Sequence, residues 1–232
     1  MISVLTPSVR PQGLSLNKQS LQRQTLNDFE WIVVSPFEYK EADVWIPDPP
    51  KKDGDFYSLC KAYNAGFKAA RGELIVSFQD QIEMEPTTLE RLWSHYEANP
   101  KACVGALGHQ YENGTMVWQD PRQTTQYGSF YLCQPIDIEF TLCSIPKQAL
   151  MDVGGIDEKF DEGAAVGEKE MLMRIDLAGY ETYLDQSILY KAEHHPRMTK
   201  DWDEKFKVAS DYFTACRNGI MNGTRPINIG AL

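Results

Sequence analysis

The chain has 232 residues, of which 42% are hydrophobic and 24% are charged, proportions that exclude a mainly disordered protein. Its formal net charge of −10 argues against a broad basic surface that neutralises nucleic acid phosphates. It has no run of 18 apolar residues, and its N-terminus has no charged lead before an apolar stretch. We therefore expect a soluble, unexported, cytoplasmic protein.

The first hundred residues alternate predicted strands and helices. Three apolar runs are typical of buried strands: 2–7, 30–35 and 73–78. Two segments between them have helical character: 14–28 and 55–72. This alternation predicts an α/β chain with a mostly parallel sheet covered by helices.

Two local signals place helix ends in this half. Gly72 follows the second helical segment and suits a left-handed stop. Thr87, with Glu90 three residues later, forms a capping box that is expected to open another helix.

The second half changes character after residue 103. Short extended runs flank a long polar excursion at 112–135, which predicts a mixed or antiparallel extension with a long loop. Later segments predict helices at 146–155, 167–180 and 202–219, and a strand at 187–195.

The five cysteines are odd in number and scattered, without a Cys-x-x-Cys pair. This pattern does not indicate structural zinc. We expect reduced thiols that pack as small hydrophobic side chains.

Asp80 raises the question of function. It follows the predicted strand at 73–78, and chemistry in open parallel sheets lies beyond the carboxyl ends of the strands. An isolated aspartate at such a place can instead cap a turn. The surrounding sequence decides between the two interpretations.

Three ordered stretches resemble the inverting nucleotide-sugar glycosyltransferases of family two: SVLTPSVRP, AYNAGFKAARGELIVSFQD and GGIDEKFDEG…GEKEMLMRIDLAGYETYLD. The resemblance spans residues 2 to about 195 and implies the A-type glycosyltransferase fold. That fold has a Rossmann-like, mostly parallel central sheet flanked by helices, with a smaller mixed or antiparallel extension on the acceptor side. We expect one domain, 1–232, with a nucleotide-sugar half to about 100, an acceptor half to about 195 and a helical extension from 196.

The resemblance implies donor contacts, residue by residue. The positions that match the family's nucleotide-binding segments are Thr6, Pro7, Arg10, Asn64 and Gly66. Pro7 can equally be a strand stop, and Gly66 a close-packing site. Where the family commonly has an acidic pair that reads the base and ribose, this chain has VVSPFEYKEAD. Ser35 can accept that contact, Glu38 can reach back to it, and a UDP-sugar is the favoured donor.

The resemblance also implies a divalent metal, Mn²⁺ or Mg²⁺, on the donor diphosphate. Asp80 falls in the family's Asp-x-Asp region, but here the residues are Gln79-Asp80-Gln81, so a single aspartate remains. Three alternatives stay open: Asp80 ligates the metal with help from amides or water, Glu83 or Glu85 replaces the lost ligand, or the metal is weak or absent. His194 and His195 lie where some members supply a late metal ligand or a diphosphate contact, and a structural role is the alternative.

Glu168 matches the position of the family's general base, near the start of the predicted helix at 167–180. An inverting transfer needs a carboxylate that takes the proton from the attacking acceptor hydroxyl. The alternative is a structural role, because acidic residues are favoured in a first helical turn.

Other residues receive secondary interpretations. Asp157 and Asp161 are expected to serve the loop of the acceptor site, and Gly154 and Gly155 a tight turn. Four aromatic residues can stack on an acceptor sugar or anchor the loop by packing: Trp118, Tyr127, Phe130 and Tyr131.

The resemblance thus implies an inverting hexosyltransferase that acts on a hydroxyl-bearing acceptor, and we expect that acceptor to be a carbohydrate. A dinucleotide oxidoreductase is disfavoured because no G-x-G-x-x-G follows the first strand. Two alternatives remain: a non-catalytic sugar-nucleotide-binding module with an eroded metal motif, and a transferase that acts on modified nucleic acid bases.

Overall fold

The computed structural model describes residues 1–49, 58–124, 129–193 and 201–232. Within them, ten strands form one sheet in the order β3-β2-β1-β4-β9-β6-β10-β5, with β7 on β6 and β8 on β10. The strands are β1 (Ile2–Pro7), β2 (Phe29–Ser35), β3 (Val44–Pro47), β4 (Leu74–Phe78), β5 (Ile82–Met84), β6 (Ala102–Glu112), β7 (Thr115–Gln119), β8 (Phe130–Leu132), β9 (Leu142–Pro146) and β10 (Glu181–Glu193).

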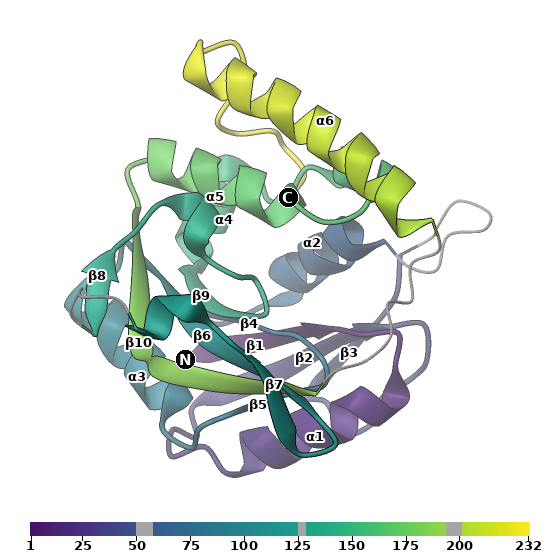
Figure 1. Cartoon of the computed structure of the whole chain (residues 1–232), viewed down its shortest axis with the longest axis vertical. Helices are drawn as coiled ribbons and strands as arrows, with labels where there is room; N and C mark the ends of the chain where they lie inside the picture. The colour runs from purple at the N-terminus through teal and green to yellow at the C-terminus, as the bar shows by residue number, and fades with distance from the viewer. Residues whose placement is uncertain (50–57, 125–128, 194–200) are drawn as a thin grey trace.

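Helices cover both faces of the sheet (Figure 1). They are α1 (Pro11–Gln22), α2 (Leu59–Ala69), α3 (Thr88–Ala98), α4 (Lys147–Val153), α5 (Gly167–Leu177) and α6 (Trp202–Met221), with short 3₁₀ turns η1 (Pro121–Thr124), η2 (Pro135–Asp137) and η3 (Glu158–Glu162). Helices α1 and α3 lie on one face, α2, α4 and α5 lie on the other, and α6 packs outside α5. A separate hydrophobic core fills each side. None of the helices in the described ranges has the length and apolar character that a membrane span requires.

The direction of the strands brings the site together. Strand β1 pairs in parallel with β2 and with β4, and β4 pairs antiparallel with β9. In the last of these pairs Phe78 lies opposite Leu142, so the carboxyl ends of β1 and β4 and the start of β9 share one edge of the sheet. Every residue of β1 and β4 is buried, as expected of strands covered on both faces.

The α/β architecture predicted from the sequence is confirmed, and two local signals are wrong. Thr87 is the N-cap of α3 but makes no side-chain cap, and Glu90 instead accepts a hydrogen bond from Thr25 Oγ1 at 2.7 Å. A partner distant in sequence thus replaces the local capping box.

The predicted helical stop at Gly72 is the second error. Helix α2 ends at Ala69, and Gly72 does not have a positive φ. A Cβ at Gly72 would lie 2.5 Å from the backbone nitrogen of Ser3. This glycine is therefore required by the close approach of two backbones. Residues 55–57 of the predicted helix lie outside the described residues.

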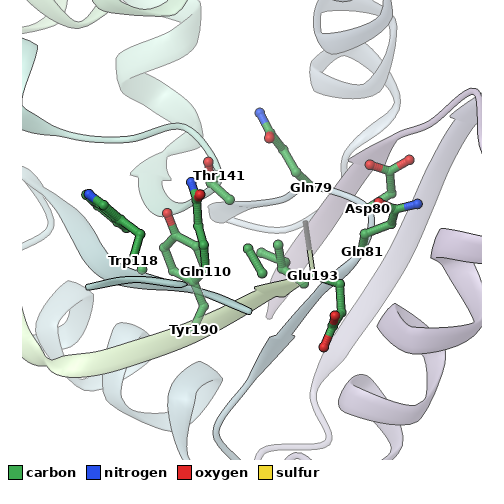
Figure 2. Close-up of a pocket in the computed structure, with 11 residues that line it drawn as sticks. Gln79, Asp80, Gln81, Gln110, Trp118, Thr141, Tyr190 and Glu193 are labelled. Atoms are coloured by element: carbon green, nitrogen blue, oxygen red, sulfur yellow. The ribbon is translucent and has the colours of Figure 1, made fainter. Parts of the chain in front are cut away.

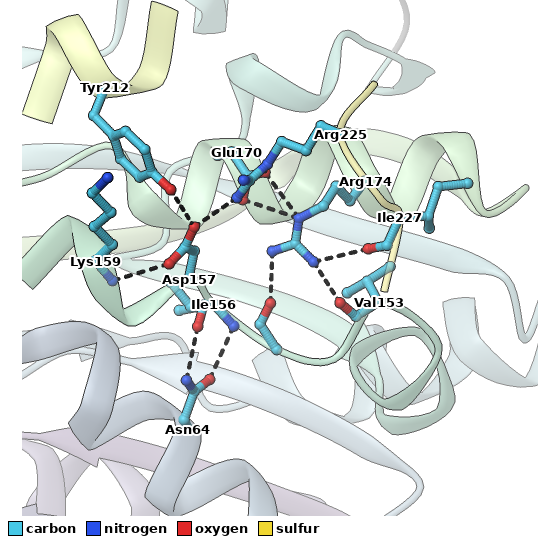
Figure 3. A network of polar contacts seen from close by, with 11 residues as sticks. Asn64, Val153, Ile156, Asp157, Lys159, Glu170, Arg174, Tyr212, Arg225 and Ile227 are labelled. Carbon is cyan, nitrogen blue, oxygen red and sulfur yellow. Dashed lines mark hydrogen bonds and ion pairs between the residues drawn. The ribbon is translucent and has the colours of Figure 1, made fainter. Parts of the chain in front are cut away.

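The helical layer above the sheet is joined by a buried ionic network (Figure 3). On α5, the Arg174 Nε donates to both oxygens of Glu170, at 2.9 and 3.0 Å, and neither side chain is exposed. The Arg174 guanidinium also donates to the carbonyls of Val153, Gly155 and Ile227. Arg225, in the segment after α6, pairs with Glu170 and with Asp157. The network thus ties α4, α5 and the C-terminal segment into one unit.

We predict that Glu170→Gln lowers the free energy of unfolding by about 3–5 kcal/mol, because Arg174 would stay buried without its counter-charge. Urea denaturation measures the change. The control is Asp211→Asn, which breaks the exposed pair between Lys207 and Asp211 on α6 and should cost no more than about 0.5 kcal/mol. A loss below about 1 kcal/mol for Glu170→Gln would contradict the assigned role of the network.

Candidate functional site

An ion pair lies where β1 and β4 end. The Arg10 Nη2 lies 2.5 Å from Asp80 Oδ1, and the Arg10 Nε donates to Asp80 Oδ2 at 3.0 Å. The Ser8 hydroxyl donates to the same Oδ2 at 2.6 Å. Both carboxylate oxygens therefore accept charge-assisted or hydroxyl hydrogen bonds. The side chain of Asp80 is 6% exposed and that of Arg10 is 20% exposed.

The first turn of α1 packs directly on this pair. A Cβ at Gly13 would lie 2.8 Å from Gln81 Cγ and 3.1 Å from Asp80 Cβ, so a glycine is needed for this close approach. Gln81 has a positive φ of 63°, a strained conformation for a non-glycine residue. Its buried Oε1 has no hydrogen-bond partner among the described residues. Strain and an unsatisfied buried acceptor in one residue are typical of a binding site.

A pocket of about 320 Å³ opens next to the pair (Figure 2). Its lining residues are Gln79, Asp80, Gln81, Ile82, Gly108, Gln110, Trp118, Thr141, Tyr190, Ala192 and Glu193. Asp80 and Gln81 lie at one end, and Trp118 and Tyr190 lie at the other. Amides, a hydroxyl and aromatic faces in one pocket suit a polar ligand with several hydroxyl groups.

Glu168 lies in the first turn of α5, which packs against the residues that precede β9. Burial raises the pKa of Glu168, and the Glu139 carboxylate adds to the rise, against the opposing effects of its own backbone N–H and of Lys169. In the described part of the chain, no salt bridge joins Glu168 to a basic side chain. Lys169 instead binds Glu139 at 3.2 Å. Glu168 is thus a half-buried carboxylate with no salt-bridge partner among the described residues.

The backbone before Glu168 is strained. Ala165 and Val166 have φ values of 64° and 62°, in the left-handed region. A β-branched residue is a genuine outlier there, at a cost of about 1–3 kcal/mol. Gly167 follows, where a Cβ would lie 3.0 Å from Cys60 Sγ. Strain of this kind is concentrated at functional sites, and here it fixes the first turn of α5.

Several predicted donor residues have their polar groups bonded within the protein. Thr6 Oγ1 donates to the Phe78 carbonyl at 2.7 Å and accepts from Trp31 Nε1 at 3.0 Å. Ser35 Oγ donates to the Phe37 carbonyl and accepts from Trp45 Nε1 at 3.1 Å. Both hydroxyls therefore make hydrogen bonds within the protein. They lie at the carboxyl ends of β1 and β2, where the resemblance places the nucleotide.

The other two donor residues sit on α2. Asn64 bonds the backbone of Ile156 in both directions, at 2.8 and 2.9 Å. A Cβ at Gly66 would lie 2.3 Å from Leu5 Cδ1, as in a close-packing site. Pro7 is the last residue of β1, which fits its interpretation as a strand stop. The structure therefore groups Arg10 with Asp80 and gives Asn64 and Gly66 packing roles.

The acidic loop residues 157 and 161 stabilise their surroundings. Asp161 accepts from the backbone nitrogens of Cys60 and Lys61, at 2.9 and 3.0 Å, and so caps α2. Burial raises the pKa of Asp161. Asp157 has a lowered pKa: burial alone would raise it, but hydrogen bonds from Arg225, the Lys159 backbone and Tyr212 outweigh that effect.

The predicted tight turn at residues 154 and 155 is confirmed, with φ values of 71° and 76°. Of the aromatic candidates, Trp118 lines the pocket, whereas Phe130 stacks between His95 and Tyr183 as a packing anchor. Tyr131 lies on β8. Tyr127, His194 and His195 lie outside the described residues.

The residues around Asp80 do not fit a divalent metal. Both oxygens of Asp80 are bonded to Arg10, and a second cation beside the guanidinium would be repelled. Glu83 pairs with Arg23 at 3.0 Å, and Glu85 is exposed. Within the ranges that the structure describes, no group of three His, Cys, Asp or Glu side chains is placed to hold a metal. The cation at Asp80 is therefore an arginine.

A family model matches part of the chain, and solved structures share its fold. Residues 56–157 match the model described as Glycosyl transferase family 2. The structure of S. aureus TarS residues 1–349 with UDP has a TM-score of 0.68 at 14% identity, covering 93% of this chain and 64% of that one. A structure of GalNAc-T7 with UDP, GalNAc and Mn²⁺ has a TM-score of 0.65 at 14% identity, covering 98% of this chain and 52% of that one.

The chain thus spans less than two thirds of either neighbour. A sequence search among curated proteins finds no match. The family model supports the predicted family over residues 56–157, and the solved structures confirm the A-type glycosyltransferase fold that the sequence motifs predicted.

Sequence reasoning missed the partner of Asp80 and part of the pocket. Ser8 and Arg10 lie about 70 residues before Asp80, and only the parallel pairing of β1 with β4 reveals their contact. Gln110, Thr141 and Tyr190 come from three further elements or loops. Gly108 was the one available signal of the pocket in the sequence. Its missing side chain makes room for the Tyr190 ring, since a Cβ there would lie 2.3 Å from Tyr190 Cζ.

We predict that Glu168→Gln makes the protein more stable at neutral pH, because the amide avoids the cost of burying a charge. The raised pKa means that the folded state holds the proton more tightly than the unfolded chain does. The stability difference from the parent should therefore shrink as pH falls through the raised pKa and vanish below about pH 4, near the ordinary glutamate value. Urea unfolding at neutral pH and below about pH 4 measures this difference in the free energy of unfolding.

The control is Glu97→Gln, at an exposed position on α3, which should change stability little at either pH. A Glu168→Gln protein that is less stable than the parent at neutral pH would show that the carboxylate has a stabilising partner.

Proposed function

We propose that this chain, a glycosyltransferase of family 2, moves a sugar from a nucleoside diphosphate donor to an acceptor hydroxyl with inversion, and that Glu168 is the general base. The observation that carries the proposal is the state of Glu168. It is a half-buried carboxylate at the strained start of α5, it has no salt-bridge partner among the described residues, and burial raises its pKa. A carboxylate with a purely structural role would be capped or paired, as Asp161 and Glu170 are.

The chemistry follows from the raised pKa of this carboxylate. Glu168 takes the proton of the acceptor hydroxyl as that oxygen forms a bond to the anomeric carbon. The bond between that carbon and the donor's phosphate oxygen breaks, and its electron pair leaves with the diphosphate. Attack on the face opposite the leaving group inverts the configuration. A base whose pKa lies above the ordinary glutamate value is better matched to this proton transfer near neutral pH.

The donor class is supported by position and by the neighbouring structures. The carboxyl ends of β1 and β4 and the first turn of α1 meet at the Arg10–Asp80 pair, where open α/β sheets bind nucleotides. The TarS and GalNAc-T7 structures contain UDP, which supports a UDP-sugar here. The pocket between Asp80 and Trp118 suits the transferred sugar or the acceptor, and a carbohydrate acceptor fits its amides and aromatic faces.

The rival proposal is a sugar-nucleotide-binding module without catalysis. The sequence Gln79-Asp80-Gln81 favours it, since it lacks the second aspartate of the metal motif. The two proposals differ in one respect, which is whether Glu168 is needed for turnover.

We predict that Glu168→Gln reduces transfer at least 10³-fold, on the order of the loss of a general base, while UDP binding stays within about threefold of the parent. In the parent, the rate should fall as pH drops through the raised pKa, because only the ionised carboxylate accepts the proton. An assay of released UDP measures the rate of transfer, and calorimetric titration measures the affinity for UDP. Near-normal turnover by Glu168→Gln would remove this residue from the mechanism.

We also predict that one nucleotide among UDP, GDP, CDP and dTDP raises the melting temperature. A ligand at 100 times its Kd stabilises by about 2.7 kcal/mol, which corresponds to a shift on the order of 5–10 °C for a chain of this length. UDP should give the largest shift. The absence of a shift with all four nucleotides would contradict both the transferase and the binding module.

A further inference from the structure

We propose that Arg10, held in place by Asp80, is the cation that binds the donor's diphosphate, so that transfer proceeds without a divalent metal. This inference rests on the proposed function, because it concerns the same donor site. In this proposal Asp80, the aspartate of the metal motif, orients Arg10 and does not bind a metal.

Arg10 and Asp80 form a bidentate pair. The Nε and Nη2 of Arg10 meet the two oxygens of Asp80 side by side, which fixes the plane of the guanidinium. Ser8 adds a third hydrogen bond to the carboxylate. A planar guanidinium held in this way is a rigid cation, and arginine is well suited to phosphate.

Arg10 also balances the charge of Asp80. A carboxylate buried as deeply as that of Asp80 requires a counter-ion or several hydrogen bonds. The guanidinium supplies both, so Asp80 has no need of a metal. Arg10 is one-fifth exposed, and its positive charge therefore reaches the solvent side of the site.

Arg10 also lies at the positive end of a helix. Arg10 is the N-cap residue of α1, a helix of 12 residues with no acidic side chain in its first turn and no side-chain cap. The positive end of the helix dipole thus adds to the charge of the guanidinium. Gly13 brings this turn against Asp80 and Gln81, so the two elements cannot move apart independently.

The consequence concerns the leaving group. When the bond to the anomeric carbon breaks, negative charge grows on the donor's diphosphate. A cation already fixed by Asp80 and Ser8 stabilises this charge without reorganising during the reaction. Arg10 therefore binds the diphosphate in the ground state and favours its departure.

The test is calorimetric titration of the parent protein with UDP, GDP, CDP and dTDP, each with EDTA and each with Mn²⁺. We expect the preferred nucleotide to bind in EDTA, with a Kd that Mn²⁺ changes by less than about threefold. Loss of a charge-assisted contact corresponds to binding about 10- to 100-fold weaker. Arg10→Gln should show this loss in EDTA, and Arg10→Lys should recover part of it. UMP, which lacks the β-phosphate, should discriminate less between the parent and Arg10→Gln.

Arg10→Gln leaves Asp80 buried and unpaired, and it can fail to fold for that reason. The double variant Arg10→Gln/Asp80→Asn removes both charges together and should fold, as circular dichroism will show, yet lose binding to the same extent. The matched control is Arg23→Gln/Glu83→Gln. It removes the pair between the other end of α1 and β5, at 3.0 Å, and should bind the nucleotide as the parent does.

The outcomes separate this inference from the proposed function. Binding that EDTA abolishes and Mn²⁺ restores would overturn the role of Arg10 and leave the transferase intact. Metal-free binding that the double variant retains would overturn it as well. Failure of all four nucleotides to bind under either condition would overturn the proposed function, and the inference with it.

Discussion

The ion pair between Arg10 and Asp80 is the interaction on which the edge of the sheet at the ends of β1 and β4 depends. It joins the loop after β1 to the end of β4, which are adjacent only because the two strands run parallel. It also holds the first turn of α1, which Gly13 allows to lie against Asp80 and Gln81. The end of β4, the first turn of α1 and the pocket therefore meet at one charged contact.

A second constraint lies at the start of α5. This start is costly, because Val166 is strained and burial disfavours the charge of Glu168. The rest of the helix offsets this cost. Two residues after Glu168, Glu170 forms a buried pair with Arg174, which also holds α4 and the segment after α6. The molecule thus keeps a half-buried carboxylate, which has no salt-bridge partner among the described residues, at the strained start of a helix that is otherwise strongly anchored.

The sequence predicted the fold where the signal was local and strong. Continuous apolar runs indicated β1, β2 and β4, because strands covered on both faces have no polar side to alternate. The helix at 167–177 and the place of Glu168 within it followed from periodicity and from the family motif. The prediction failed where a residue's role depends on a partner distant in the sequence. Glu90 bonds Thr25 instead of capping its own helix, and Gly72 serves the approach of two backbones.

The same reason explains what was missed in the site. Thr6 and Ser35 have the expected positions, but their hydroxyls face tryptophan side chains of neighbouring strands, which no local pattern reveals. Asp80 was recognised, and its partner was not, because about 70 residues separate Arg10 from it and only the strand order brings them together. The antiparallel strand β9, which separates β4 from β6, likewise gave no sign of its place in the sheet.

The most direct measurement is a crystal structure of the protein grown with UDP and Mn²⁺ together. We expect the Arg10 guanidinium to be paired with Asp80 and to lie within hydrogen-bonding distance of a phosphate oxygen, with no ion between the aspartate and the diphosphate. A Mn²⁺ ion bound to Asp80, with Arg10 turned away from the carboxylate, would contradict it.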